Sequence, residues 1–563
     1  LDANTTASNN TAIGTNALTA NTTGAHNTSV GQSSLKANTT GGSNTAVGRV
    51  ALFANTTADN NTAIGYGTLL SNTTGTQNTA LGANALDANT TANYNTAIGY
   101  NSLTANTTGA NNTAVGRESL YSNTTASNNT AVGYNAMNVN TTGADNTAVG
   151  TNALDANTTG SYNAAFGKHA LTASTTADYN SAFGTTSLYS NTTGNYNTTV
   201  GADSLKNNTT ASNNTACGYA ALNANVTGND NTAVGKEALK LNTGGLNTAV
   251  GNEALESNTT GNNNTAMGCG ALDANTTASD NVAIGYAALG ANTTGDLNTA
   301  IGTQSMSNCT NSDRNVAVGF ATLQNIASGQ GDTYHTCIGY GAGNAITTAT
   351  QQTHVGANAG LSVTTGNSNT FIGYNAGSGT TTGAHNTAVG RAIFQSNSTG
   401  SSNTSMGANA LQSNSTGSEG VAIGYNALNA NTTASNNTAV GCEALEKCTT
   451  GAQNTSVGFR ALEEMTTASN NTAVGAYAGD DVSTGYNNTL IGHDAGGNLT
   501  TGYNNIAIGY QSNFPSSASD GNIILGNSSI GHLRCQVSSI EGLSDERDKT
   551  DIVDLAEGLD LIN

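Results

Sequence analysis

The chain of 563 residues lacks tryptophan, has a single proline and carries charge on only 9% of its residues. Ordinary disorder needs abundant charge or proline, so this composition argues against a disordered chain. Hydrophobic residues make up 36%, too few for the several globular cores that this length would otherwise predict. No apolar run approaches a membrane span, so membrane insertion is not expected. The formal net charge of −20 disfavours nucleic acid and anionic membranes as partners.

What the chain does have is a repeat. A glycine that ends the run Asn-Thr-Ala-Val/Ile-Gly recurs every 17 residues, from Gly14 and Gly31 to Gly526. The step shortens to 16 before Gly251 and lengthens to 20 before Gly339, which gives 31 copies. We number each copy from this glycine as position zero. Position −1 is then Val, Ile, Leu, Met or Phe, position −2 is Ala or Ser, positions −4 and +7 are mostly Asn, and position +4 is usually Leu.

A unit of 17 residues is too short for a helix–turn–helix repeat and fits two short strands with two turns. The predicted strands are Thr-Ala-Val before the glycine and Ala-Leu after it. Stacked coils would bury a thin continuous core, and Asn at −4 and +7 would form amide ladders along the stack. The predicted fold is therefore all-β: a parallel β-solenoid, or β-roll, of about 31 coils. At about 4.8 Å per coil it would be a rod on the order of 150 Å long.

The first strand has two apolar faces, because −1 lies opposite the small residues at −2 and zero. We expect −1, where Cys217 replaces Val, to face the interior, and the small residues to pack against another chain. A wide monomeric solenoid is the alternative. Position +4 becomes Gly in five coils, which predicts thinner coils and two shaft segments, 1–320 and 321–526. These glycines are Gly343, Gly360, Gly377, Gly479 and Gly496.

The unit Asn-Thr-Ala-Val-Gly-x-x-Ala-Leu resembles the head repeats of trimeric autotransporter adhesins. It resembles even more the repeat shafts of phage tail fibres, and the resemblance covers roughly residues 1–526. The adhesin family implies a left-handed parallel β-roll with three chains side by side. The present repeat is longer than the usual adhesin head unit. The resemblance thus implies a homotrimeric shaft.

The repeat stops after Gly526, and a connector, 527–543, leads to Ser544-Asp-Glu-Arg-Asp-Lys549. Apolar residues then follow at near-helical spacing, which predicts a short C-terminal helix within 544–563. This stretch resembles the start of the intramolecular chaperone domain (peptidase S74 family) of phage tail fibres and tailspikes. In that family the domain trimerises the fibre and often cleaves itself off at a Ser–Asp bond. The resemblance implies cleavage between Ser544 and Asp545, with Ser544 as nucleophile and Lys549 as base.

One residue departs from the family pattern. Asp548 stands where many relatives carry an apolar residue, and a carboxylate beside Lys549 would raise the lysine pKa and oppose its role as a base. The alternative to cleavage is a capped turn that leads into the helix. At the other end the sequence starts with Leu1 at position +4, inside a coil, so we expect a piece of something longer.

Few other residues suggest chemistry. Tyr162, Tyr179 and Tyr196 occupy −5 in successive coils and predict a stacked column, which either contacts a glycan or only stabilises the solenoid. The seven cysteines are scattered and predict buried free thiols, with Cys309 and Cys448 at +7. The seven histidines form no repeat column, and single surface or satisfied histidines are expected. Carboxylates at −6 or −5 are expected as solvated turn residues, so we predict no metal and no cofactor.

Three functions compete. The first is the structural shaft of a phage tail fibre in the virion, with a host-surface receptor, a glycan being one candidate, and other tail proteins as partners. The second is a trimeric bacterial surface adhesin or extracellular filament. The third is an enzyme such as a glycan depolymerase, which would need converging carboxylates that the repeat does not place together. We expect no enzyme activity of the shaft itself.

Overall fold

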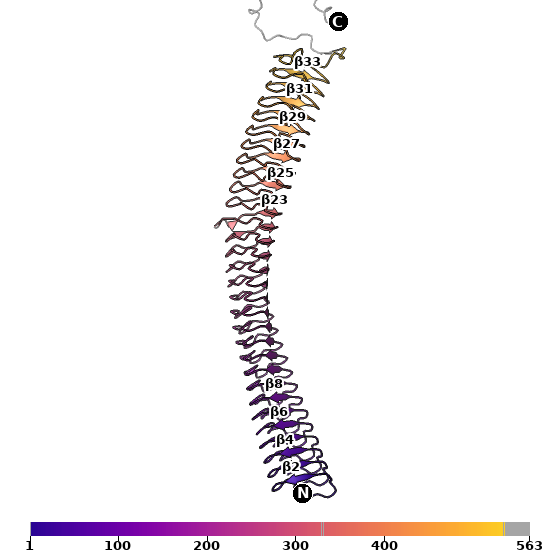
Figure 1. The fold of residues 1–563 in the computed structure, drawn as a ribbon, viewed down its shortest axis with the longest axis vertical. Helices are drawn as coiled ribbons and strands as arrows, with labels where there is room; N and C mark the ends of the chain where they lie inside the picture. Colours follow the sequence, from indigo (N-terminus) through magenta and orange to yellow (C-terminus); the bar gives the residue numbers. More distant parts are fainter. Residues whose placement is uncertain (1, 328, 330, 533, 535–563) are drawn as a thin grey trace, which may run out of the picture.

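The computed structural model of the chain describes residues 2–327, 329, 331–532 and 534. They form a long, gently curved rod, with the N-terminus at one end and β33 (Ile523–Leu525) at the other (Figure 1). The described residues contain 33 short strands and no helix, and 31 of the strands form one parallel sheet. The prediction of an all-β parallel solenoid with a 17-residue repeat is confirmed. The predicted C-terminal helix lies outside the described residues.

Each strand of the main sheet covers positions −3 to −1 of its coil. In the first half of the rod they are β1 (Thr11–Ile13), β2 (Thr28–Val30), β3 (Thr45–Val47), β4 (Thr62–Ile64), β5 (Thr79–Leu81), β6 (Thr96–Ile98), β7 (Thr113–Val115), β8 (Thr130–Val132), β9 (Thr147–Val149), β10 (Ala164–Phe166), β11 (Ser181–Phe183), β12 (Thr198–Val200), β13 (Thr215–Cys217), β14 (Thr232–Val234), β15 (Thr248–Val250), β16 (Thr265–Met267), β17 (Val282–Ile284) and β18 (Thr299–Ile301).

The second half continues the sheet with β20 (Val316–Val318), β22 (Thr336–Ile338), β23 (Thr353–Val355), β24 (Thr370–Ile372), β25 (Thr387–Val389), β26 (Thr404–Met406), β27 (Val421–Ile423), β28 (Thr438–Val440), β29 (Thr455–Val457), β30 (Thr472–Val474), β31 (Thr489–Ile491), β32 (Ile506–Ile508) and β33. Strands pair in strict register, so that Val316 lies opposite Thr336 even across the longer step. The extra residues of this step lie outside the main sheet. Beside them, β19 (Ser312–Asp313) and β21 (Gly331–Asp332) pair in a separate two-stranded sheet.

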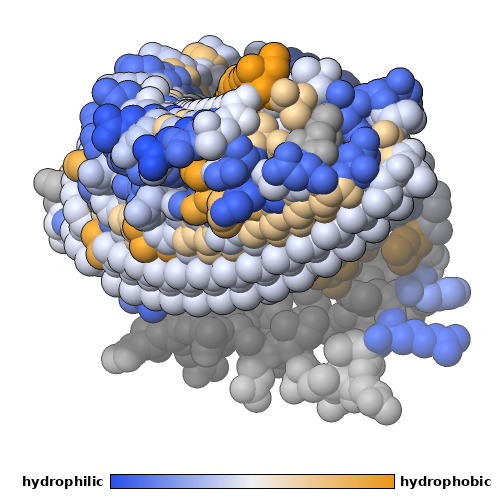
Figure 2. Space-filling model, turned by 90° about the horizontal axis from the view of Figure 1, so that it is seen from below, coloured by the Kyte–Doolittle hydropathy of each residue, from blue (hydrophilic) through white to orange (hydrophobic). Residues whose placement is uncertain are grey.

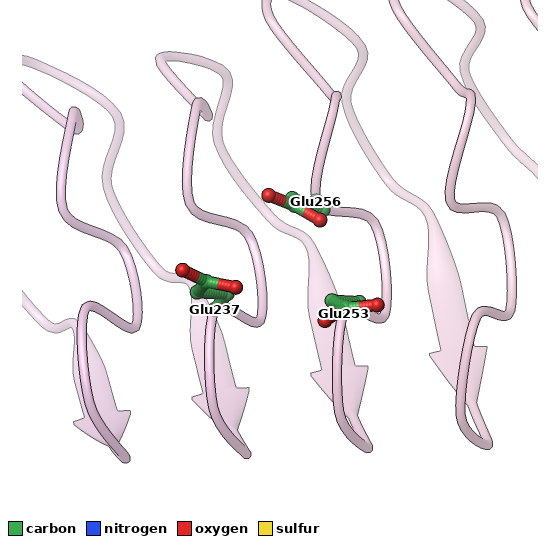
Figure 3. Close-up of side chains that lie close together, drawn as sticks. All are labelled: Glu237, Glu253 and Glu256. Atoms are coloured by element: carbon green, nitrogen blue, oxygen red, sulfur yellow. The ribbon is translucent and has the colours of Figure 1, made fainter.

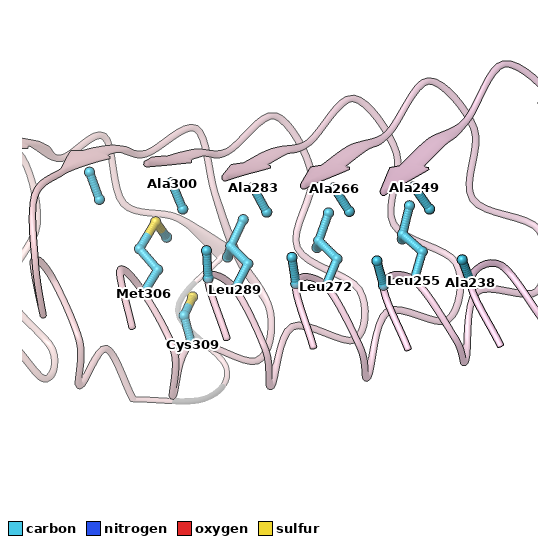
Figure 4. Packing of buried hydrophobic residues seen from close by; sticks show 14 of the residues in the cluster. Ala238, Ala249, Leu255, Ala266, Leu272, Ala283, Leu289, Ala300, Met306 and Cys309 are labelled. Atoms are coloured by element: carbon cyan, nitrogen blue, oxygen red, sulfur yellow. The ribbon is translucent and has the colours of Figure 1, made fainter. Parts of the chain in front are cut away.

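The prediction of a second strand in each coil is wrong. The Ala-Leu run lies in a turn, with left-handed backbone at Leu18 (φ 52°) and at Asn16 (φ 58°), the residue before the run. Left-handed residues bend the chain sharply and cannot continue a strand. The bend directs Leu at +4 into the core from the side opposite the main strand (Figure 4).

The predicted orientation of the main strand is also wrong. Ala63 at −2 is fully buried, whereas Ile64 at −1 is 38% exposed, and the other coils repeat this pattern. Leu at +4 fills most of the narrow space between the two walls of the coil, so only a small residue fits opposite it at −2 (Figure 4). Val and Ile therefore face outwards, and the small residues face the core of their own chain.

The zero glycine is required by the next coil. Gly48 has φ 136°, and a Cβ atom there would lie 2.2 Å from the carbonyl oxygen of Gly65. No other residue combines this backbone conformation with such close packing. Its small size serves the stacking of coils within one chain.

The predicted amide ladders are confirmed. In the first ladder the backbone N–H of Asn44 donates to Oδ1 of Asn27 (2.9 Å), and its side-chain Nδ2 donates to the carbonyl oxygen of Ala58 (2.8 Å). In the second ladder Nδ2 of Asn55 donates to Oδ1 of Asn38 (2.8 Å) and to the same carbonyl oxygen (3.1 Å). These amides are fully buried, and their hydrogen bonds link each coil to the next.

Coils with Gly at +4 keep a filled core. Phe371 at −2 is fully buried, and a Cβ atom at Gly377 would lie 2.2 Å from its Cδ2 atom. Leu490 at −2 lies in the same way beside Gly479 and Gly496. A large side chain from the strand thus replaces the leucine from the turn. The expectation of thinner coils is corrected accordingly: the side chain is exchanged between walls rather than lost.

Candidate functional site

The outer face of the main sheet carries a continuous apolar stripe at position −1. Figure 2, which looks onto the N-terminal end of the rod, shows hydrophobic residues gathered in rows among hydrophilic ones. Large exposed side chains at −1 occur from one end of the rod to the other: Ile13, Ile64, Leu81, Phe183, Val200, Val234, Met267, Ile301, Ile338, Ile372, Met406, Ile423, Val457, Val474, Ile491, Ile508 and Leu525. A contiguous exposed apolar surface of this length is typical of a surface that contacts another protein.

The predicted tyrosine column exists. The rings of Tyr162 and Tyr179 stack at 4.8 Å with an interplanar angle of 4°, and those of Tyr179 and Tyr196 stack at 5.2 Å and 5°. The pKa of Tyr179 is raised, mainly because the ring is desolvated and to a smaller extent because Tyr162 and Tyr196 lie beside it. Both faces of Tyr179 are covered, so a sugar ring would find free aromatic faces only at the two ends of the column. Glycan contact by these residues stays a prediction.

Two groups of carboxylates that were not predicted from the sequence converge on the turn side of the coils. Glu237, Glu253 and Glu256 bring one oxygen each within 4.8 Å of one another (Figure 3), as do Glu443, Glu446 and Glu463. They lie at +2 and +5 of neighbouring coils. The sequence places them close together only when successive copies of the repeat are aligned and these two positions are compared between copies.

Basic side chains neutralise much of both groups. Nζ of Lys240 lies 3.2 Å from Glu237 and 2.9 Å from Glu256, and Lys236 pairs with Glu237 at 3.0 Å. Hydrogen bonds from Lys236, which has the largest effect, and from Lys240 lower the pKa of Glu237. In the second group, Arg460 lies 2.6 Å from Glu443. Both groups are thus ion-pair networks.

Buried polar groups gather in two successive coils near the longer step. His335 and His354 are almost fully buried, and among the described residues neither ring nitrogen of His354 has a hydrogen-bond partner. Burial lowers the pKa of His335 to about 4 and that of His354 to about 3. Cys337 lies opposite His354 in the sheet register, and burial raises the pKa of its thiol. The expectation of surface or satisfied histidines is therefore wrong for these two, since −4 and −2 both point into the core.

The cysteines divide by position. Cys309 and Cys448 at +7 are buried free thiols, as predicted, and so is Cys337 at −2. Cys217 at −1 is exposed, which corrects the expectation that it lies inside, for the same reason that Val and Ile at −1 face outwards. Cys269 at +1 is exposed as well.

Carboxylates at −6 bond to the backbone of the preceding coil, as expected of turn residues. Oδ1 of Asp59 accepts from the N–H of Gly42 at 2.6 Å, and Asp178 accepts from Ser161 at 2.7 Å. The predicted cleavage residues Ser544, Asp545 and Lys549 lie outside the described residues. In the described part of the chain no helix is long and apolar enough to cross a membrane.

A comparison of the chain with known protein families finds no match, and neither does a comparison with curated proteins.

Proposed function

We propose that this chain is the shaft of a phage tail fibre, an appendage of the virion that reaches a receptor on the host surface. The β-solenoid is compatible with the structural shaft of a fibre or of an adhesin. The shaft would join other tail proteins at one end and present an adhesive tip at the other. The residue pattern at Ser544–Lys549 favours the fibre over a bacterial surface adhesin, which stays the alternative.

The observation that carries the proposal is the unbroken main sheet of 31 strands in register. Each strand of the main sheet pairs in register with its neighbours, and most coils repeat the leucine core and the two amide ladders. Stiffness along the axis follows because bending must stretch several rows of hydrogen bonds at once. Reach and stiffness are the physical requirements of a shaft.

The second part of the proposal is that three chains pack side by side through the outer face of the main sheet. The apolar stripe at −1 would then be covered along the whole rod, and one apolar residue per coil would add to the interface. The small residues at −2, which were predicted to contact another chain, face the core of their own chain instead. The left-handed sense of winding stays a prediction.

The third part concerns the end of the chain. By its resemblance to the chaperone family, the segment that starts at Ser544 would assist assembly of the trimer and then release itself. Lys549 would take the proton of the Ser544 hydroxyl, which would act as the nucleophile, and the peptide bond between Ser544 and Asp545 would break as the Asp545 amine leaves with that proton. Water would then hydrolyse the serine ester and leave a carboxylate on Ser544. The shaft would keep Ser544 as its last residue.

Light scattering on the purified chain tests the association. Each chain has a mass of 56.0 kDa, so we expect a particle three times as heavy. Replacing Ile64 and Ile98 at −1 with Lys should yield monomers, because charges would enter the apolar interface. Thr74→Lys, at an exposed turn of the Gly65 coil, is the matched control and should leave the mass unchanged. A wild-type particle of one chain would refute the trimer.

Native cysteines identify the face that is covered. Cys217 and Cys269 are both exposed on a single chain. If chains pack through the −1 face, maleimide should modify Cys269 rapidly and Cys217 slowly, and Cys217 should become reactive in the monomeric Lys variant. Equal rapid labelling of the two thiols in the wild-type particle would argue against this interface.

Mass spectrometry of the mature C-terminus tests the processing step separately. A chain produced with its downstream segment should end at Ser544, and Ser544→Ala should abolish this end. Peptides that span Ser544 and Asp545 in the mature wild-type protein would exclude cleavage while leaving the shaft proposal intact.

A further inference from the structure

A hollow of about 500 Å³ interrupts the turn side of the rod around Tyr286. Its lining comes from four successive coils, those of Gly251, Gly268, Gly285 and Gly302. In this region the main strands lie on one side of the core, and the turn segment of Ala238 and Leu272 lies on the other (Figure 4). The hollow opens on the turn segment, away from the outer face of the sheet.

The hollow exists because two side chains are missing. Positions +2 and +5 face each other across the turn and normally carry longer residues, such as Glu237 and Lys240, which are joined by an ion pair. Here Gly270 stands at +2 and Gly290 at +5. A Cβ atom on Gly270 would meet nothing within 4 Å. A longer residue at this place would therefore fill the hollow without a clash.

The charge at the hollow is negative. Asp273 and Glu253 both line it. Desolvation raises the pKa of Asp273, and the nearby carboxylates of Glu256 and Glu253 raise it further. Among the ion pairs of the described residues Glu253 has a partner in Lys236, at 3.5 Å, whereas Asp273 has none. A bound cation would relieve this repulsion.

An aromatic ring forms another part of the wall. Tyr286 is 58% exposed, and within the described part of the chain no second ring stacks on it and no cation lies over it. Elsewhere on the same column Arg117 lies 6.0 Å from the ring of Tyr100 and 5.7 Å from that of Tyr134. The +1 tyrosines of this rod thus already attract organic cations of its own chain.

We propose that the hollow is a binding site for a primary ammonium group, such as the side chain of an exposed lysine on another molecule. Asp273 would pair with the ammonium group, and this group would lie over the face of the Tyr286 ring. The amide oxygen of Gln304 would accept a further hydrogen bond from it. An ammonium ion fits better than a divalent metal, because Asp273 belongs to no group of three close ligands in the described residues.

The site is independent of the proposed assembly. A trimer that packs through the −1 face would leave the turn side open to solvent, and a single chain would expose it equally. Loss of the trimer in the Lys variant would therefore leave binding unchanged, and failure of binding would say nothing against the shaft.

Ligand-observed NMR on the whole chain, with Nα-acetyl-lysine amide as the probe, tests the site. Gly270→Asn fills the hollow with the residue that other coils carry at +2 in the same left-handed conformation, as at Asn84 and Asn101. It should weaken binding at least tenfold. Gly67→Asn is the matched control, because Gly67 also lies at +2 with φ 64° and does not line the hollow; it should change binding less than twofold.

A second pair of variants tests the charge. Asp273→Asn should weaken binding at least tenfold, and Asp155→Asn, at the same +5 position away from the hollow, should not. Equal losses in both members of a pair would overturn the site, since they would reflect general attraction to the acidic rod. Absence of probe binding, or equal binding of glucose as a neutral probe, would overturn it too.

Discussion

Gly360 makes room for His354: a Cβ atom at Gly360 would lie 2.2 Å from Cε1 and 2.3 Å from Nδ1 of the imidazole. In an ordinary coil the same space holds a leucine from the turn, as Leu86 does opposite Ala80. Positions −2 and +4 therefore share one space in the core, which is filled by a large side chain either from the strand or from the turn. Substitutions at −2 and +4 should be strongly coupled.

This coupling predicts that Gly360→Leu alone overpacks the core and destabilises its coil by about 1–3 kcal/mol. The double variant His354→Ala with Gly360→Leu restores the ordinary pair and should recover most of that loss. Hydrogen exchange of the amides in β23 measures the effect locally, which matters because a long solenoid need not unfold as one unit. A double variant as unstable as the single one would contradict the exchange of volume.

The buried histidines predict a local weakness in acid. Their pKa values in the fold, about 4 for His335 and about 3 for His354, lie below the ordinary value near 6.5 that they regain on unfolding. The unfolded state therefore binds more protons below pH 6.5, so stability is full above that pH and falls as the pH drops towards 4 and 3. We expect β22 and β23 to lose about 4–5 kcal/mol of protection between pH 7 and 4.5, while β6 loses little.

Two substitutions taken from the repeat itself provide the control. His354→Phe copies Phe371, which occupies the same position in the next coil beside Gly377, and His335→Asn restores the usual residue of the ladder. The double variant should retain its protection at pH 4.5. If β22 and β23 still weaken in acid, the histidines are not the cause.

Periodicity predicted the coil number, the register and the ladders, because these depend only on the repeat. It could not decide which face of the strand points inwards, since both Ala at −2 and Val at −1 are apolar. What decides is Leu18 and its equivalents at +4, whose left-handed backbone turns them into the core and leaves room only for Ala. The hollow at Tyr286 could not be predicted in the same way. Gly270 and Gly290 create it only because neighbouring coils carry longer side chains at the same positions, +2 and +5.

The amide ladder predicts a sharp difference between two substitutions of Asn72. Its Nδ2 donates to Asn55 (3.0 Å) and Gly75 (2.9 Å), and its Oδ1 accepts from Asn89 (2.8 Å). Asn72→Asp removes both donated bonds and places an acid in a buried site, so we expect a loss of about 3 kcal/mol or more. Asn72→Val copies Val363 and Val482, which are buried at the same position, and should cost less.

Hydrogen exchange of β3 and β5, the strands of the coils before and after the substituted one, would measure both changes. Because the introduced carboxyl group is neutral only at low pH, Asn72→Asp should destabilise the coil less at pH 4 than at pH 7. Equal losses for the two variants would show that shape, rather than hydrogen bonding, sets the requirement for Asn.

The tyrosine column predicts a stabilising role for its middle ring. Tyr179 has φ 57°, a conformation that Asn adopts at the same position of other coils, as Asn128 does at φ 62°. Tyr179→Asn should therefore leave the turn intact and remove only the stacking, at a cost of about 0.5–1.5 kcal/mol in the protection of β11. Asn128→Ala, in a coil without the column, controls for a general effect of changing −5. If the column instead binds a glycan through its free ends, Tyr162→Asn and Tyr196→Asn would each reduce binding on a glycan array. Tyr179→Asn would reduce glycan binding less, because the ring of Tyr179 is covered on both faces, or would increase it by exposing new aromatic faces.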